Sequence, residues 1–412
     1  MKNLIFCTAI LLLASCGGGQ KKAAVQTQGE RIIPEFDLSE PSKAAIGEKL
    51  TWNDLAKNIR VIPLETNDAS LLGGLCTIKA VTGGHIALFS QNVVAVGSGY
   101  MFNPGDPVNA IVIFGRDGKH ELTLRRQGKG GASAMEYLRI DEAVFIEEPF
   151  TIRIYDGMQN AFLDYDRTGK GVSFKLREEP RMRYPEFPIA INDDYYFDID
   201  QALPLYNRNE ILTLRGYDGS SKVFLSIDAP LHPDAMNGRS LPVAVSKYRD
   251  GALAYMNLGD TVYKVTGDGM EEFARIKRGS YSFDEGIYRV KLEDNREVLK
   301  SSICVENFVN AGEYYCMAYE LQDFVYAEIW KDGESKPVVR RAADSKSASQ
   351  LFNISKGLKL DCTIQGGTIP LTVIPDYADG DKFYFLVEAH KLTDIIPGIE
   401  EDDNQVLIEM EF

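Results

Sequence analysis

The sequence predicts an all-β protein, a six-bladed β-propeller in which an N-terminal strand closes the last blade. Three observations lead to this prediction. A strand followed by a turn of the Asp-Gly type recurs along the chain, a second strand precedes each copy, and the chain ends in a strand that has no turn after it. Four short strands repeated at a fixed period are the pattern of propeller blades.

The turn repeat is the strongest signal. Its glycines stand at positions 118, 169, 219, 269 and 333, so the steps are 51, 50, 50 and 64 residues. Glycine is favoured in such hairpin turns because it adopts a positive φ without steric cost, and a preceding Asp can bond the turn backbone. We therefore expect a positive φ at each of these glycines, and helices only as insertions near residues 284–301 and 342–355.

A strand of alternating or aromatic character precedes each turn copy, and the chain holds six such strands for five turns. The sixth turn is missing because the chain ends in the strand 406–410. We expect its partner to be the early strand 59–64, which would close the ring and leave no blade half built. The six second strands are expected at residues 86–89, 152–155, 195–197, 252–255, 314–317 and 383–387.

The N-terminus predicts export. Lys2 precedes an apolar run over residues 4–13, which is too short to cross a bilayer because a spanning helix needs about 20 residues. The following Leu13-Ala14-Ser15-Cys16 resembles the lipobox of bacterial lipoproteins, which implies cleavage before Cys16 and acylation of that cysteine. The alternative is an ordinary secretory signal with an incidental cysteine.

Residues 17–29 are small and polar, as in a flexible tether. The usual sorting pattern of lipoproteins implies transfer to the outer membrane, because position 17 is Gly and not Asp. The tether lacks the acidic cluster of surface-exported lipoproteins, which favours the periplasmic face. We therefore predict a signal peptide over 1–15, lipidated Cys16 with tether and lead-in over 16–57, and a propeller over 58–412.

Composition argues against several classes of partner and cofactor. The chain carries 45 basic and 60 acidic residues, a net charge of −15, and no basic cluster longer than two residues, so a nucleic-acid partner is not expected. Four histidines without metal-binding spacing, and cysteines without a CxxC motif, predict neither a metal nor another cofactor. Cys304 and Cys316 are the best candidates for a disulfide, the alternative being buried, inert thiols.

Three segments carry a resemblance to a known family. Residues 61–66 are similar to its entry strand, residues 113–119 to its first turn, and Arg125-Arg126-Gln127-Gly128-Lys129-Gly130 leading to Glu136-Tyr137 to the segment between its first two blades. On these grounds the mature chain resembles the NHL-like six-bladed β-propeller lipoproteins of the Bacteroides group. That family's activity is largely undefined. Residues 132–135 lie where the family usually has a shorter link.

No segment carries a complete catalytic signature. The glycines over 128–131 lack the strand-loop-helix context of a phosphate site, so we expect a loop between blades, held by Glu136 and Tyr137. Acidic runs at 193–194 and 400–403 could provide the carboxylate pair of a glycosidase, but a turn and a solvated loop are the simpler interpretations. No Gly-x-Ser-x-Gly motif is present.

Two functional hypotheses remain. The first is a non-catalytic binding or assembly module for a peptide, glycan or partner protein, and the second is a propeller hydrolase or lyase acting on a glycan or peptide. In either case we expect the ligand at one end of the central channel, where six blades bring distant residues together. The candidate ligand-binding residues are Tyr137, Arg139, Tyr184, Glu186, Lys247 and Glu306.

Overall fold

The structure is a computed structural model that divides into two compact units, Met1–Ile32 and Ile33–Phe412. The second unit contains every helix and strand described below. The described residues are 32–91, 93–96, 99–102, 109–129, 131, 134–176, 189–190, 194–199, 210–226, 243–249, 251–283, 300–344 and 358–412.

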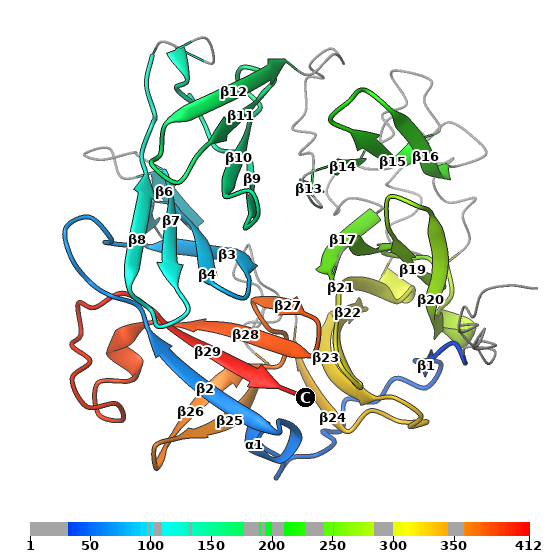
Figure 1. Ribbon diagram of the computed structural model, residues 1–412. Helices are drawn as coiled ribbons and strands as arrows, with labels where there is room; N and C mark the ends of the chain where they lie inside the picture. The colour runs from blue at the N-terminus through cyan, green and yellow to red at the C-terminus, as the bar shows by residue number, and fades with distance from the viewer. Residues whose placement is uncertain are drawn as a thin grey trace, which may run out of the picture. The chain divides into compact units, whose positions relative to one another are not determined.

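Six sheets of four or five strands lie in a ring, which confirms the six-bladed propeller (Figure 1). Each blade is built on four antiparallel strands, and the six predicted second strands coincide with β4, β10, β14, β18, β22 and β28. Blades 1 to 3 contain β3 (Leu75–Val81), β4 (His85–Gln91), β7 (Ala110–Gly115) and β8 (His120–Leu124); β9 (Glu142–Ile146), β10 (Thr151–Asp156), β11 (Ala161–Tyr165) and β12 (Gly171–Leu176); and β13 (Ile189–Ala190), β14 (Tyr195–Ile199), β15 (Glu210–Gly216) and β16 (Ser221–Ser226).

Blades 4 to 6 complete the ring, and two of them, blades 4 and 6, receive a strand from the N-terminal part of the unit. Blade 4 has a fifth strand, β1 (Glu35–Asp37), and blade 6 takes β2 (Asn58–Pro63) as its outer strand. The remaining strands are β17 (Val243–Tyr248), β18 (Gly251–Met256), β19 (Thr261–Val265) and β20 (Met270–Lys277); β21 (Cys304–Ala311), β22 (Tyr314–Leu321), β23 (Phe324–Lys331) and β24 (Val339–Asp344); and β27 (Tyr377–Asp379), β28 (Lys382–Val387) and β29 (Val406–Glu411).

The turn prediction holds at four of the five glycines. Gly118, Gly169, Gly219 and Gly333 have φ values of 84°, 70°, 94° and 77°. Gly269 is a correction, because its φ lies outside the left-handed region. There the turn is closed by a hydrogen bond from the Thr266 N–H to the Gly269 carbonyl oxygen at 2.9 Å.

Ring closure follows the prediction. β2 pairs antiparallel with β29, from Asn58 opposite Glu411 to Pro63 opposite Val406. An ionic contact reinforces the closure from blade 1, because Arg116, in the turn after β7, pairs with Glu409 on β29. Lys382 of β28 lies 3.1 Å from the same carboxylate. The first and last blades are therefore joined by both backbone pairing and charge.

The N-terminal lead-in packs with the blades, and the compact unit that contains them begins at Ile33. β1 pairs parallel with β20, with Phe36 opposite Ile276. Farther along, Ile46 forms an isolated bridge with Arg340 of β24, and the helix α1 (Trp52–Leu55) precedes β2. This segment therefore contacts the outer strands of blades 4 and 5 before it enters blade 6.

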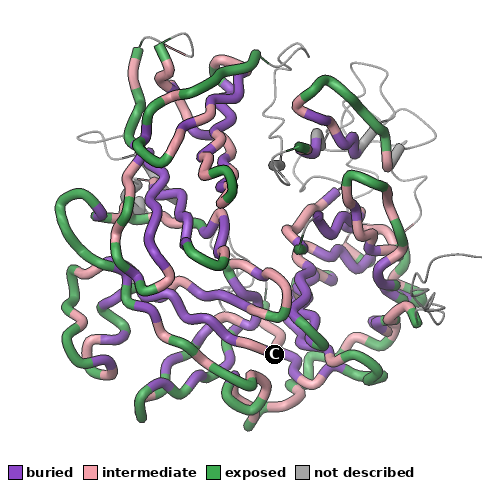
Figure 2. Tube along the Cα trace, in the orientation of Figure 1, coloured by how far each residue is buried: buried purple, intermediate pink, exposed green. Residues whose placement is uncertain are grey.

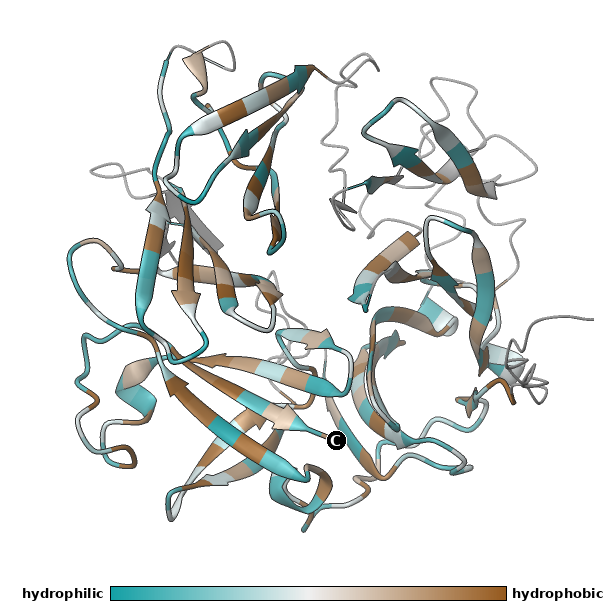
Figure 3. Ribbon diagram, viewed as in Figure 1, coloured by the Kyte–Doolittle hydropathy of each residue, from teal (hydrophilic) through white to brown (hydrophobic). Residues whose placement is uncertain are grey.

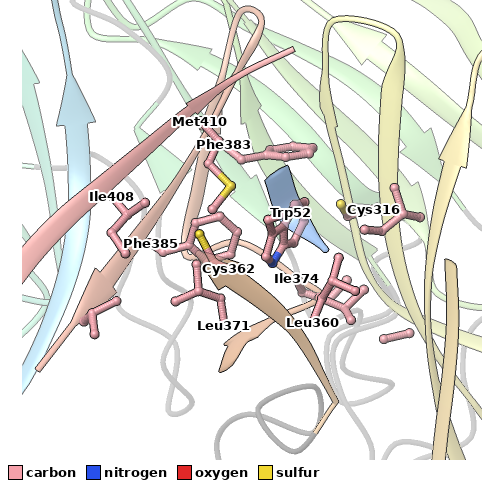
Figure 4. Close-up of a cluster of buried hydrophobic side chains, with 14 of the residues drawn as sticks. Trp52, Cys316, Leu360, Cys362, Leu371, Ile374, Phe383, Phe385, Ile408 and Met410 are labelled. Atoms are coloured by element: carbon pink, nitrogen blue, oxygen red, sulfur yellow. The ribbon is translucent and has the colours of Figure 1, made fainter. Parts of the chain in front are cut away.

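The most extensive apolar cluster surrounds Trp52 (Figure 4). The indole is fully buried and lies 5.2 Å, between ring centroids, from Phe385 of blade 6. Leu360, Cys362 and Leu371 of the hairpin β25 (Lys359–Ile364) and β26 (Gly367–Thr372) pack in the same cluster. Since burying one large aromatic side chain contributes several kcal/mol, Trp52 secures the lead-in to blades 5 and 6.

Of the two interpretations left open for Cys304 and Cys316, buried free thiols are confirmed. The two cysteines lie on neighbouring strands, but Cys304 pairs with Glu320 and Cys316 with Val309, and both thiols are free and buried. The insertion expected over 342–355 is strand β24 as far as Asp344, and the residues beyond it, like residues 284–299, lie outside the described chain. The hairpins β25–β26 and β5 (Val93–Val96) with β6 (Gly99–Phe102) were not predicted.

Candidate functional site

Tyr137, a predicted ligand-binding residue, is buried and holds the loop between blades 1 and 2. Its hydroxyl donates to the Asn109 carbonyl oxygen at 2.6 Å and accepts from the Arg126 N–H at 3.1 Å. Burial raises the pKa of this hydroxyl to about 12. The Gly128 N–H donates to the Tyr137 carbonyl oxygen, so this glycine serves the loop, as expected. Tyr137 therefore presents no surface to a ligand.

The other described candidates occupy both ends of the inner strands. One end of the ring, which we call the turn face, carries the turns after the first and third strands of each blade. The opposite end, the connection face, carries the links between blades. Arg139 pairs with Asp141 in the link before β9, and Glu306, near the start of β21, accepts a hydrogen bond from the Cys304 thiol at 3.0 Å. Both therefore lie toward the connection face. Lys247 lies near the end of β17, toward the turn face.

The four predicted ligand-binding residues that the structure describes are thus not gathered at one channel mouth. Lys247 lies near Asp379 at the end of β27, and contacts between β17 and β27 bring blades 4 and 6 together there. Burial raises the pKa of Asp379, while the charges of Lys247 and Arg249 oppose the increase. Tyr184, Glu186 and Cys16 lie outside the described residues.

A cluster of polar side chains joins blades 1 and 2. His85 at the start of β4 is 7 % exposed, and its Nδ1 lies 2.8 Å from a Glu147 carboxylate oxygen. Its Nε2 lies 3.3 Å from Glu121 and 3.4 Å from an Arg167 guanidinium nitrogen. Both ring nitrogens are engaged within the protein, so the arrangement is suited to joining two blades.

The outer strand of blade 2 exposes a row of large apolar side chains to solvent. β12 exposes Val172, Phe174 and Leu176 at 59 %, 47 % and 60 %. It is the outermost strand of its sheet, and Figures 2 and 3 show its exposed, partly apolar course at the rim. Single exposed apolar residues are ordinary, whereas a row of them on an open edge strand marks an interaction surface or an aggregation hazard.

The strand register shows which face of blade 2 carries the exposed apolar side chains of β12. Phe174 pairs with Leu163 and Leu176 pairs with Ala161, and both partners are buried in the core between blades 1 and 2. Lys175 pairs with Phe162, which faces the opposite way, toward Tyr196 and Tyr217 of blade 3. β12 therefore has an apolar face toward blade 1 and a cationic side chain toward blade 3.

A pocket of about 220 Å³ lies between blades 2 and 3 beside this strand. Three aromatic rings form its wall. Phe162 lies 5.0 Å from both Tyr196 and Tyr217, between ring centroids, and the two tyrosines lie 5.1 Å apart. Phe162 comes from β11, Tyr196 from β14 and Tyr217 from the turn after β15. The pocket is therefore built on strands of both blades.

An ion pair behind the aromatic wall fixes its geometry. Arg153 of β10 contacts both carboxylate oxygens of Asp164, at 2.7 and 2.9 Å, and its guanidinium carbon lies 4.0 Å from the Tyr217 ring centroid. This bidentate pair with cation–π stacking restricts the tyrosine. Burial raises the pKa of Tyr217, so its phenol stays neutral.

Cationic side chains stand at the pocket mouth. Lys175 donates from Nζ to the Tyr217 carbonyl oxygen, which spans the two blades, and Arg215 also lines the pocket. Among the residues that the structure describes, its lining includes no His, Cys, Asp or Glu side chain. Cations beside an aromatic wall can bind a carboxylate on an apolar or planar body.

Sequence reasoning missed this site because it looked to the channel axis. The available signal was the alternation Val172-Ser173-Phe174-Lys175-Leu176 in a fourth strand, where an outward face should be polar. Tyr217 carried no such signal, since it stands inside a turn. Among the residues that the structure describes, no cluster of His, Cys, Asp and Glu could hold a metal ion, and no helix is long and apolar enough to cross a membrane.

The fold and this rim pocket define an all-β ring protein with an aromatic-walled pocket between two blades. The chain belongs to the DUF4934 family, a family defined by a domain of unknown function, whose profile matches residues 36–411. Comparison with curated proteins gives no match.

Two solved structures from Bacteroides match this chain in the structural comparison. One is a Bacteroides fragilis protein inferred to be exported, with a TM-score of 0.56 and 11 % identity over 92 % of this chain and 99 % of that one. The other is a DUF4221 family member from Bacteroides vulgatus, with a TM-score of 0.44 and 10 % identity over 87 % and 96 % of the two chains. At such identities the similarity concerns the fold alone.

Proposed function

We propose that this protein is a lipid-anchored, non-catalytic assembly module that binds an extended segment of a peptide or partner protein along β12. The exposed row of Val172, Phe174 and Leu176 on an edge strand is the observation that carries this proposal. An edge strand offers unpaired N–H and C=O groups to an incoming strand, and its side chains set specificity.

The molecule already contains one example of strand addition. β1 adds to the outer edge of β20, and Phe36 inserts between blades with its ring centroid 4.9 Å from that of Tyr315. β12 has no such added strand among the described residues. An incoming segment on β12 would cover its exposed row in a comparable way.

The two faces of β12 specify the sequence of the partner. Side chains on the blade 1 face would contact Phe174 and Leu176 and are expected to be apolar. Side chains on the blade 3 face would approach Lys175 and the pocket, where an acidic group is expected. The partner is therefore a strand in which apolar and acidic residues alternate.

The alternative function, a hydrolase or lyase acting on a glycan or peptide, has less support at this rim pocket. Among the described residues, its lining combines aromatic, cationic and hydroxyl groups and contains no carboxylate or imidazole. A glycan ligand would need exposed ring faces for stacking, whereas Phe162 and Tyr196 are each only 6 % exposed. Peptide binding is therefore the function that this geometry supports best.

Short random peptides displayed on phage would test the proposal, with the full-length protein as bait. Enriched peptides should alternate apolar and acidic residues, and calorimetry with one synthetic peptide should show binding at least tenfold weaker to Phe174→Ser/Leu176→Ser. Val223→Ser, at a 43 % exposed position on β16, is the matched control and should bind normally. Enrichment without this alternation, or equal binding by the double variant, would refute the site.

The anchor forms a separate part of the proposal. Cys16 follows a lipobox-like sequence, and acyl chains on this residue would hold the propeller to the periplasmic face of the outer membrane, as in the NHL-like lipoproteins that the chain resembles. Cys16→Ser should abolish labelling by an alkyne fatty acid and release the protein from the outer-membrane fraction. Retained labelling would show that another residue is modified.

A further inference from the structure

A second cavity lies between α1, β2 and the tip of the β25–β26 hairpin, with a volume of about 610 Å³. Residues 56–61 form one side, and Thr363, Ile364 and Gln365 form the other. We call it the β2 groove. Its size lies within the range of small-molecule sites, so it can hold a ligand of several rings.

The width of the β2 groove is fixed by hydrogen bonds. Asn53 of α1 donates to the Thr363 carbonyl oxygen at 3.0 Å and accepts from the Thr363 N–H at 2.7 Å. The hairpin tip is a two-residue turn in which Gln365 and Gly366 both have positive φ, at 49° and 90°. Such a turn has the twist of its strands, so the tip is held in place.

The charge of the groove is opposite to that of the protein. Lys57 and Arg60 line it, and its lining includes no Asp or Glu, although the whole chain carries a net charge of −15. One guanidinium nitrogen of Arg60 donates to the Arg116 carbonyl oxygen at 2.8 Å, which orients the side chain and leaves further donors for a ligand. Among the described residues, the groove therefore presents two cationic side chains and no carboxylate.

The remaining lining groups indicate the class of anion. Asn58 and Gln365 offer amides, which both donate and accept hydrogen bonds, and Thr363 adds a hydroxyl. Ile59 and Val61 provide a partly buried apolar side. Sugar rings have the matching properties, since their hydroxyls pair with amides and their C–H faces pack on apolar groups.

We propose that the β2 groove binds an acidic oligosaccharide, with its carboxylates on Lys57 and Arg60 and its hydroxyls on the amides. This site is distinct from the β12 edge and does not depend on the peptide-binding proposal. An acidic peptide is the main competing ligand, and it is an outcome that the experiment separates.

Calorimetry with the full-length protein tests the proposal, with trigalacturonate as the acidic probe and maltotriose as the neutral one. Trigalacturonate should bind, and its affinity should fall as salt is added because the contacts are ionic. Maltotriose should bind at least tenfold more weakly. Absence of trigalacturonate binding, or equal binding of the neutral sugar, would overturn the proposal.

Variants locate the site. Lys57→Glu and the double variant Lys57→Gln/Arg60→Gln should each weaken trigalacturonate binding about tenfold or more. The control Lys119→Gln/Lys336→Gln removes the same charge at exposed positions outside the groove and should change affinity less than twofold. Lys57→Glu replaces a side chain with no hydrogen bond in the described residues, so it covers the case in which loss of Arg60 disturbs folding. Unchanged affinity in Lys57→Glu, or tighter binding of polyglutamate than of trigalacturonate, would refute the assignment.

Discussion

Replacing Tyr137 with Phe distinguishes a structural role for this residue from a role in binding. The substitution removes one oxygen atom and leaves the ring in place. Two backbone groups then lose their partner: the Asn109 carbonyl oxygen loses a donor, and the Arg126 N–H loses an acceptor. Because the side chain is completely buried, water cannot replace the hydroxyl without rearrangement of the loop.

The expected loss of stability follows from these contacts. A buried polar group left without a partner costs about 1–3 kcal/mol, so we expect Tyr137→Phe to lower the free energy of unfolding by about 2 kcal/mol. The compact unit has roughly 380 residues, and an unfolding entropy of about 2.1 cal/mol/K per residue gives about 0.8 kcal/mol/K. The melting temperature should therefore fall by about 2.5 °C.

Differential scanning calorimetry and titration with a β12-binding peptide measure the two effects separately. Tyr263→Phe is the control, since its partly exposed hydroxyl has no hydrogen bond within the described chain, and its melting temperature should stay within 1 °C of that of the unmodified protein. An unchanged melting temperature in Tyr137→Phe would refute the structural role. Loss of peptide binding at unchanged stability would place Tyr137 in the ligand site after all.

Three further substitutions test how the ring is held together. Glu409→Gln should cost about 3 kcal/mol at neutral pH because it leaves Arg116 without its charge partner. Burial raises the pKa of Glu409, but the bonds from Arg116 and Lys382 outweigh it and leave the pKa below 4.5, so this stabilisation is present above pH 4.5 and is lost as the pH falls through the lowered pKa. If Glu409→Gln had the same acid-unfolding curve as the unmodified protein, this stabilising role of Glu409 would be contradicted. Gly118→Ala should lower the free energy of unfolding by at least about 2 kcal/mol in calorimetry, because φ is +84° and the new Cβ would lie 2.0 Å from the Pro63 carbonyl oxygen. Gly333→Ala is the control: its φ is +77° but the space around it is open, so it should cost only about 1 kcal/mol. Equal costs for the two variants would refute the clash at Gly118. Phe36→Ala should weaken docking of β1 by about 3 kcal/mol and speed amide hydrogen exchange in β1. The control Ile32→Ala, at a 91 % exposed position, should leave this exchange unchanged. Unchanged exchange in Phe36→Ala would mean that Phe36 does not hold the strand.

The strands were predictable because each carries its own signal. Alternating apolar residues and glycine turns recur at nearly equal steps, so six second strands and the closure by β2 followed from sequence alone. β1 did not follow, because three residues are too few to show a period of two. Its position depends on a pocket formed by Phe308, Tyr315 and Trp330, which only the folded ring brings together.

The site was predicted less well for a related physical reason. Sequence reasoning located polar and aromatic residues near the inner strands but could not determine which of them would be buried. Tyr137 is an example, since a tyrosine that binds a ligand and one that holds a loop have the same local sequence. The pocket between blades 2 and 3 depends on Phe162, Tyr196 and Tyr217, which are 55 positions apart from first to last.

The outer strands of the six blades differ in what covers them. The lead-in contacts the outer strands of blades 4 and 5 and supplies that of blade 6, while β12 of blade 2 keeps a row of three large apolar side chains in solvent. Because these side chains are about half exposed, covering them would contribute about half of the 1.5–3 kcal/mol of full burial each before costs, or roughly 3 kcal/mol in total. Loss of translational and rotational freedom on association offsets much of that gain. Backbone pairing and the Lys175 contact must therefore supply the rest, so we expect affinity in the micromolar range and a reversible complex.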